Sequence, residues 1–197
     1  MKSFFILFIA LLLMVAGAQE LSAQDYIIGR FYEGYIITLD GERQDGYIKY
    51  EKFNTMQSSI IFATDPKSRR TRTAYKAKAL SGFMVAGHTW HSIPFKDLIG
   101  PKQQKFMQLD LDGYIKLYLF YGTESNVSAD AQVVIRKGDE VAFNQGTFIT
   151  GFHKKASELV SEHTALADKI RNKEKGYKLL QLYDIIDEYN AWYRENN

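Results

Sequence analysis

The segment Gly34-Tyr-Ile-Ile-Thr-Leu-Asp-Gly-Glu-Arg-Gln-Asp-Gly-Tyr-Ile-Lys-Tyr50 places Asp40-Gly41 between two runs in which apolar and polar residues alternate. Alternation with a period of two is typical of a β-strand that buries one face. Asp-Gly between two such runs favours a type I′ turn, which needs positive φ at both central residues. The segment therefore predicts a β-hairpin with a two-residue turn.

A two-residue turn would also fix the register of this hairpin. It would set Tyr35 opposite Gly46 and Gly34 opposite Tyr47, so that each glycine faces a tyrosine across the strands. An aromatic ring can cover the gap that a strand glycine leaves. We therefore expect the reciprocal pairing to lock the register, although two Gly-Tyr-Ile triplets can also recur by chance.

Short alternating segments continue to about residue 150. They predict further strands, several of them joined as hairpins through Gly87-His88, Asp110-Leu-Asp-Gly113 and Gly138-Asp139. Nine or ten short strands at regular spacing favour an antiparallel barrel or sandwich. The expected strands after the first hairpin are 58–64, 70–75, 83–86, 89–93, 104–110, 114–121, 131–137 and 141–144.

The hairpin through Asp110-Leu-Asp-Gly113 allows a more specific prediction. A three-residue loop that ends in Gly113, with this glycine as a left-handed bulge, would pair Leu109 with Ile115 and Met107 with Leu117. This register gathers the aliphatic side chains on one face of the sheet.

The apolar period changes near residue 156. Apolar residues recur at intervals of three and four over 156–170 and again over 179–193, which predicts two amphipathic helices separated near Gly176. Their apolar faces must be buried, and the sheet is the available surface. The expected fold is α+β: an antiparallel β-barrel or sandwich of about nine to ten short strands, followed by a C-terminal helical hairpin packed on it.

The first residues resemble a secretory signal peptide. Lys2 precedes an apolar run over 4–18, and cleavage after Ala18 or Ala23 would leave a mature chain. The expected organisation is a signal peptide at 1–23, a β domain at 24–151 and a helical pair at 152–197. No transmembrane span is expected after cleavage.

The composition limits the cellular locations and the classes of partner that we expect. The chain of 197 residues has no cysteine, so we do not expect a lipoprotein, and export to a bacterial periplasm or to the exterior fits a disulfide-free domain. The net charge of +2 gives no global field towards nucleic acid, and no nucleic-acid partner is expected.

Linear motifs of catalysis and of cofactor binding are not found, and we predict no catalytic residue, metal site or cofactor. His88 and His91 have a spacing that suits metal binding poorly on a strand, and His163 falls on an apolar helical stripe. The acidic residues near Asp112 are explained by a turn rather than by a calcium loop. A hydrolase site assembled only in three dimensions stays open as a less favoured alternative.

One basic run could carry a function. On a strand over 70–76, Arg70, Arg72 and Lys76 would share a face and could bind a polyanion. The alternative is a charged edge strand that prevents aggregation between sheets. The abundant tyrosines are similarly ambiguous, since they could line a ligand surface or pack across strands.

Several short motifs resemble a group of small exported β-rich proteins of unknown function that are common in Bacteroidetes. The matching residues are 34–41, 46–50, Leu80-Ser-Gly-Phe83 and Tyr189-Asn190. The resemblance implies an envelope or secreted location and transfers no activity.

The favoured function is a non-enzymatic, envelope-associated or secreted interaction module, whose partner could be an envelope protein or a glycan. The alternative is a binder of a small apolar ligand or a glycan, in a barrel mouth or in a cleft between sheet and helices.

Overall fold

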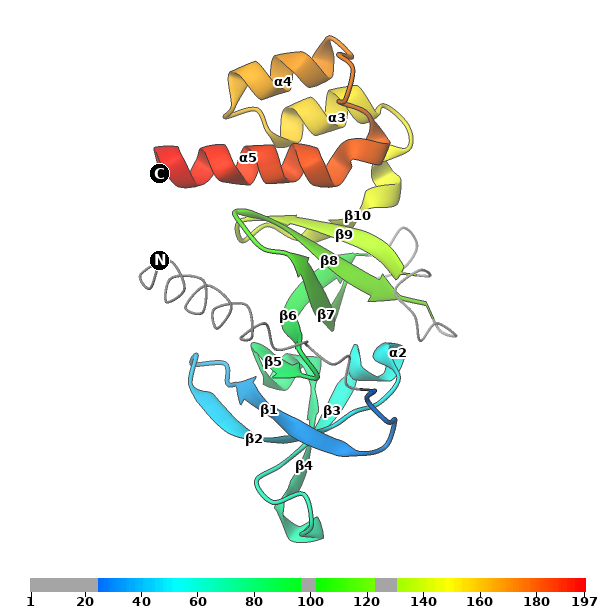
Figure 1. Ribbon diagram of the computed structural model, residues 1–197, viewed down its shortest axis with the longest axis vertical. Coiled ribbons are helices and arrows are strands. Elements are labelled where there is room, and N and C mark those ends of the chain that lie inside the picture. The colour runs from blue at the N-terminus through cyan, green and yellow to red at the C-terminus, as the bar shows by residue number, and fades with distance from the viewer. Residues whose placement is uncertain (1–24, 97–101, 123–130) are drawn as a thin grey trace, which may run out of the picture.

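The computed structural model describes residues 25–96, 102–122 and 131–197, and it has the expected α+β architecture (Figure 1). The predicted signal peptide lies outside the described residues. Ten strands form one continuous sheet, in the order β10-β9-β8-β7-β6-β5-β1-β2-β3-β4. The strands are β1 (Phe31–Ile37), β2 (Arg43–Lys49), β3 (Ser59–Ala63), β4 (Arg72–Lys76), β5 (Gly82–Val85), β6 (His88–Lys96), β7 (Gln103–Leu111), β8 (Ile115–Tyr121), β9 (Ala131–Lys137) and β10 (Ala142–Asn144).

A parallel pairing between β10 and β6 closes strands β6 to β10 into a barrel. The barrel interior is filled by side chains that are at most 3% exposed, and these belong to Ile93, Phe95, Met107, Tyr118, Val134 and Ala142. Strands β1 to β5 continue from β6 as a second curved sheet, and β6 and β7 connect the two halves in Figure 1. The barrel alternative of the sequence prediction is therefore the correct one.

The sheet formed by β1 to β5 encloses an aromatic core. Trp90 is fully buried, stacks on Phe83 with ring centroids 5.5 Å apart, and lies beside Phe53 and Tyr121. Phe53 begins the short helix α2 (Phe53–Met56), which packs into this core from one side. Buried aromatic rings contribute large apolar areas, and the buried residues of this cluster come from the strands, α2 and the segments between them rather than from the C-terminal helices.

Helices α3 (Phe152–Leu159), α4 (Thr164–Arg171) and α5 (Leu182–Asn196) lie on the outer face of the barrel (Figure 1). Their buried residues form one cluster with Ile115, Leu117 and Ile135 of the barrel strands. The prediction of one helix over 156–170 is wrong, because the chain turns at 160–163 and makes two short helices. The break lets Val160 and Leu166 both reach the same core, where each is fully buried.

The register of the first hairpin differs from the prediction by one residue. Gly34 lies opposite Gly46, and Tyr35 lies opposite Asp45, so neither glycine is covered by a tyrosine across the strands. The predicted glycine–tyrosine lock is therefore wrong.

The cause is a loop of three residues instead of two. Gly41 has φ of +87°, whereas Asp40 does not adopt positive φ, and the Gly41 amide donates to the Thr38 carbonyl at 3.2 Å. A type I turn followed by a left-handed glycine is the common three-residue alternative to a type I′ turn. The Thr38 hydroxyl stabilises it by accepting a hydrogen bond of 3.0 Å from the Glu42 amide.

Two further hairpins show how turn chemistry decides register. The turn between β5 and β6 lies one residue earlier than predicted, at Ala86-Gly87, where φ is +56° and +75°. The hairpin through Gly138-Asp139 joins β9 to β10 as predicted.

The hairpin between β7 and β8 does not have the predicted register. Leu109 lies opposite Tyr118, Leu111 lies opposite Leu117, and Gly113 is not left-handed. Gly113 instead packs against Asn190 of α5, where an added Cβ would collide with the amide group of Asn190. This close contact explains why glycine occupies the turn.

Among the described residues, no helix is both long enough and apolar enough to cross a membrane.

Candidate functional site

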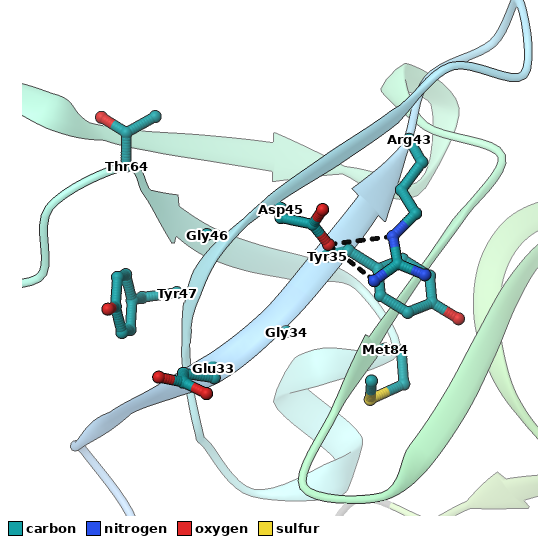
Figure 2. A pocket seen from close by; sticks show the side chains of 9 residues that line it. All are labelled: Glu33, Gly34, Tyr35, Arg43, Asp45, Gly46, Tyr47, Thr64 and Met84. Atoms are coloured by element: carbon teal, nitrogen blue, oxygen red, sulfur yellow. Dashed lines mark hydrogen bonds and ion pairs between the residues drawn. The ribbon is translucent and has the colours of Figure 1, made fainter.

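The outer face of the β1–β2 hairpin carries a groove of about 600 Å³ (Figure 2). Its floor is the backbone of the facing glycines Gly34 and Gly46. A Cβ added at Gly46 would lie 2.5 Å from the ring of Phe62, and one added at Gly34 would collide with the carbonyl oxygen of Met84. The two glycines therefore allow neighbouring groups to approach the hairpin closely.

Side chains from four segments rise around this floor. Alternation along each strand points Glu33 and Tyr35 of β1 to the same face as three residues of β2. The complete lining is Glu33, Gly34, Tyr35, Arg43, Asp45, Gly46, Tyr47, Thr64 and Met84.

One wall of the groove is a fixed guanidinium–carboxylate pair. Arg43 donates to the Asp45 carboxylate from Nε at 2.9 Å and from Nη2 at 2.6 Å. The guanidinium also lies over the ring of Tyr35, 3.9 Å from its centroid (Figure 2). Because both charged side chains are mostly exposed, the pair contributes little to stability. Its effect is to hold donors and acceptors in a defined orientation beside the groove.

The opposite wall is formed by Tyr47 and Glu33, which face each other across the strands. All thirteen tyrosines lie in the described part of the chain. Twelve of them have a ring, a cation or a hydrogen-bond partner for the side chain. Within these described residues, the side chain of Tyr47 has no such partner, and Glu33 has no ion pair. A half-buried, unengaged aromatic ring is therefore available at the groove.

A second, smaller hollow of about 250 Å³ adjoins this groove at Tyr35. It lies over Gly82, between Ile37 on one side and Thr89 and His91 on the other, and it is more apolar than the groove. Tyr35 lines both hollows, so they form adjacent depressions on one surface.

The predicted basic face is only partly assembled. Arg72 and Lys76 lie on β4, but Arg70 lies in the preceding 3-10 turn (Arg69–Thr71), so the three do not share one strand face. Arg72 is engaged locally, since it donates to the Pro66 carbonyl at 2.8 Å and lies over Phe31. In the described sheet β4 pairs only with β3, which makes it an edge strand. Binding of a polyanion by these residues stays a prediction.

The histidines of the sequence analysis are separated. The Nδ1 atom of His88 is 3.2 Å from the Gln108 amide nitrogen, whereas His91 Nδ1 is 3.0 Å from the Tyr118 hydroxyl. Burial lowers the pKa of both imidazoles and raises the pKa of Tyr118 to about 12. Far from these, the His163 ring stacks on Trp192, with centroids 4.7 Å apart.

The acidic residues are also used locally. Asp112 accepts a hydrogen bond from the Gly113 amide and pairs with Lys116, which lowers the pKa of its carboxyl. Asp110 accepts a hydrogen bond of 2.5 Å from the Tyr183 hydroxyl. Over residues 25–96, 102–122 and 131–197, no group of three histidine or acidic side chains could hold a metal ion.

Sequence reasoning did not find the groove. Its residues are separated along the chain, and the predicted register would have put a tyrosine over each glycine. Outward alternation of Glu33, Tyr35, Asp45 and Tyr47 was the available signal, but it indicates a shared site only when the three-residue loop is known.

Comparison with known proteins identifies no family for this chain. No protein-family model, curated protein or solved structure matches the chain.

Proposed function

We propose that the protein is an exported, non-enzymatic interaction module of a bacterial envelope or its exterior, and that it contacts its partner through the groove on the β1–β2 hairpin. The observation that carries the proposal is the unengaged Tyr47 ring, which lines the same groove as the oriented Arg43–Asp45 pair. A few oriented polar groups beside an aromatic surface are typical of a recognition site.

The packing of the interior supports a surface site. Side chains fill the barrel, and the helices bury their apolar residues against its outer strands. A ligand held in the barrel or between sheet and helices would have to displace these side chains. The open groove requires no such change.

The groove also suits binding better than hydrolysis. The carboxylate of Asp45 is engaged by the Arg43 guanidinium. Binding without turnover is therefore the expected outcome when the exported chain is incubated with envelope material and the products are analysed.

Export is tested by expressing the full chain in a bacterium and fractionating the cells. We expect the protein in the periplasm or medium, with a mature N-terminus at Gln19 or Gln24. Recovery of an uncleaved chain from the cytoplasm would contradict export.

Interaction is tested by retention of the purified exported chain on immobilised envelope fractions. Substitution of Asp45 and Tyr47 by alanine should reduce retention. Gly122→Ala, whose Cβ position meets no described residue, should not. Equal retention of the groove variant would contradict the proposed contact surface, and release of cleaved products would contradict a non-enzymatic role.

A further inference from the structure

We propose that the groove binds a neutral glycan chain, with Tyr47 as the stacking surface and with Glu33 and the Arg43–Asp45 pair as partners for sugar hydroxyls. This inference rests on the proposed function and specifies its ligand class. These side chains lie around the backbone of Gly34 and Gly46 in the groove of Figure 2.

The spacing of the walls suits a flat ring. Successive outward residues of a strand are about 7 Å apart, which is the distance between the Glu33–Tyr47 level and the Tyr35–Asp45 level. A ring between two surfaces needs about 3.5–4 Å to each of them for van der Waals contact. A pyranose ring can therefore lie over the glycine floor with its C–H face against Tyr47, which has no other ring partner among the described residues.

The polar groups match hydroxyls. A carboxylate only accepts hydrogen bonds and a guanidinium only donates them, whereas each sugar hydroxyl does both. Arg43 and Asp45 hold each other at 2.6 Å and present a donor and an acceptor side by side. Glu33 supplies a second carboxylate across the floor. Two adjacent hydroxyls can bridge such groups with good geometry.

The charge of the groove selects against polyanions. Its lining has two carboxylates and one guanidinium, and the guanidinium is already paired with Asp45. Because Glu33 has no ion pair among the described residues, the lining carries a net negative charge, which would disfavour an acidic glycan. The basic residues Arg72 and Lys76 belong to the edge strand β4 and do not line the groove.

An extended peptide fits less well. Peptides that bind sheets by strand addition use an unpaired edge, where their backbone groups find partners. The groove instead lies on the face of β1 and β2, whose strands pair with each other along their length, while residues 34–37 of β1 pair with β5 and residues 47–48 of β2 pair with β3. A peptide lying there would have to satisfy its own N–H and C=O groups elsewhere.

The adjoining hollow predicts a chain rather than a single sugar. Tyr35 separates the polar groove from the smaller hollow over Gly82, so a second sugar unit can continue past it. Affinity should therefore increase from a monosaccharide to an oligosaccharide.

The test is calorimetric titration of the purified exported chain with neutral cellohexaose, xylohexaose and N-acetylchitohexaose. Polygalacturonate serves as the anionic probe and an uncharged heptapeptide as the peptide probe. We expect at least one neutral hexasaccharide to bind more tightly than its monosaccharide. Tyr47→Ala should weaken that binding about tenfold, because the stacking surface is lost.

Two variants distinguish the contribution of the Tyr47 ring to binding from a general effect on folding. Tyr47→Phe keeps the stacking surface and should stay within about threefold of the parent chain. Gly122→Ala should bind like the parent, since no described residue lies within 4 Å of its Cβ position. Comparable circular dichroism of all variants shows that a loss of binding is not a loss of folding.

The glycan assignment is overturned if none of the neutral hexasaccharides binds, if Tyr47→Ala binds as well as the parent, or if only the polyanion or the peptide binds. If retention on envelope fractions still depends on Tyr47, the protein is an interaction module that uses this groove, and only the proposed ligand class is wrong. Retention that is indifferent to Tyr47 would remove both proposals.

Discussion

The two halves of the sheet differ in how far their outer faces are covered by helices. The barrel formed by β6 to β10 is covered by α3, α4 and α5, whose apolar residues are buried against Ile115, Leu117 and Ile135. The outer face of the β1–β2 hairpin is not covered by these helices and exposes Tyr47, Glu33 and the Arg43–Asp45 pair (Figures 1 and 2). The covered face contributes to the apolar core, whereas the open face is the surface through which we propose that the protein contacts its partner.

The largest effect is expected where α5 holds the barrel. Asn190 accepts a hydrogen bond of 2.9 Å from the Ile115 amide and donates one of 2.8 Å to its carbonyl. Asn190→Ala leaves both buried backbone groups without partners and should lower the free energy of unfolding by about 3 kcal/mol. Denaturant unfolding measures this.

The matched control is Asn196→Ala near the end of the same helix. Its side-chain bond to the Trp192 carbonyl is exposed, so its effect should stay within about 0.5 kcal/mol. Equal unfolding free energies for Asn190→Ala and the parent chain would show that the helices are not fixed through this contact.

A somewhat smaller loss is expected at the floor of the groove. Gly46→Ala forces a Cβ to 2.5 Å from the Phe62 ring and 2.7 Å from the Ala63 carbonyl. Overpacking of this kind should cost about 2 kcal/mol of stability, measured by the same unfolding experiment. Gly122→Ala is the control, and a neutral Gly46→Ala would mean that the hairpin does not lie against Phe62 as described.

A pH-dependent effect should appear at the junction of the two halves, where β6 carries His88 and His91. Burial lowers the pKa of both groups below 6.5, so the unfolded chain binds more protons as the pH falls through that value. Stability should therefore be complete above pH 6.5 and decrease towards the lower pKa of the folded state. The free energy of unfolding, measured at pH 7.5 and at pH 5.5, gives the loss of stability. The double variant His88→Gln with His91→Gln should lose less stability between these pH values than the parent chain. An equal loss in both proteins would show that these histidines are not its source.

The smallest effect is expected at the edge strand. Replacing Arg70, Arg72 and Lys76 by alanine removes three exposed charges and should lower the salt concentration that elutes the chain from an anionic-glycan column. Stability should change by less than about 1 kcal/mol, because within the described part of the chain Arg72 alone of the three has a side-chain partner. Unchanged retention would discard the polyanion prediction and leave the charges as protection of an exposed edge.

The strands could be predicted because period-two alternation and glycine turns are local signals. Register could not, since Asp40-Gly41 fits both a type I′ turn and a three-residue loop, and the Thr38 hydroxyl decides between them in the folded chain. Closure of the barrel by β10 and β6 joins residues almost 50 positions apart along the chain, and the alternation in either strand does not reveal it.

In the helical region, too, the local sequence pattern does not reveal the tertiary contacts. An apolar stripe over 156–170 fits one straight helix, but packing of Val160 and Leu166 into a single core favours a turn between two helices. Asn190 stood out only through the Tyr-Asn motif, and its contact with Gly113 links segments that no local pattern relates. For the candidate site, charge density pointed to Arg70, Arg72 and Lys76, whereas the groove depends on which residues lie opposite each other.

Nuclear magnetic resonance mapping of the exported chain during titration with neutral envelope polysaccharide tests whether the β1–β2 groove is the binding surface. If it is, amide shifts should concentrate at Glu33, Tyr35, Asp45 and Tyr47 and leave α3, α4 and α5 unchanged. Shifts that concentrate on the helices, with those four residues unaffected, would contradict binding at this groove.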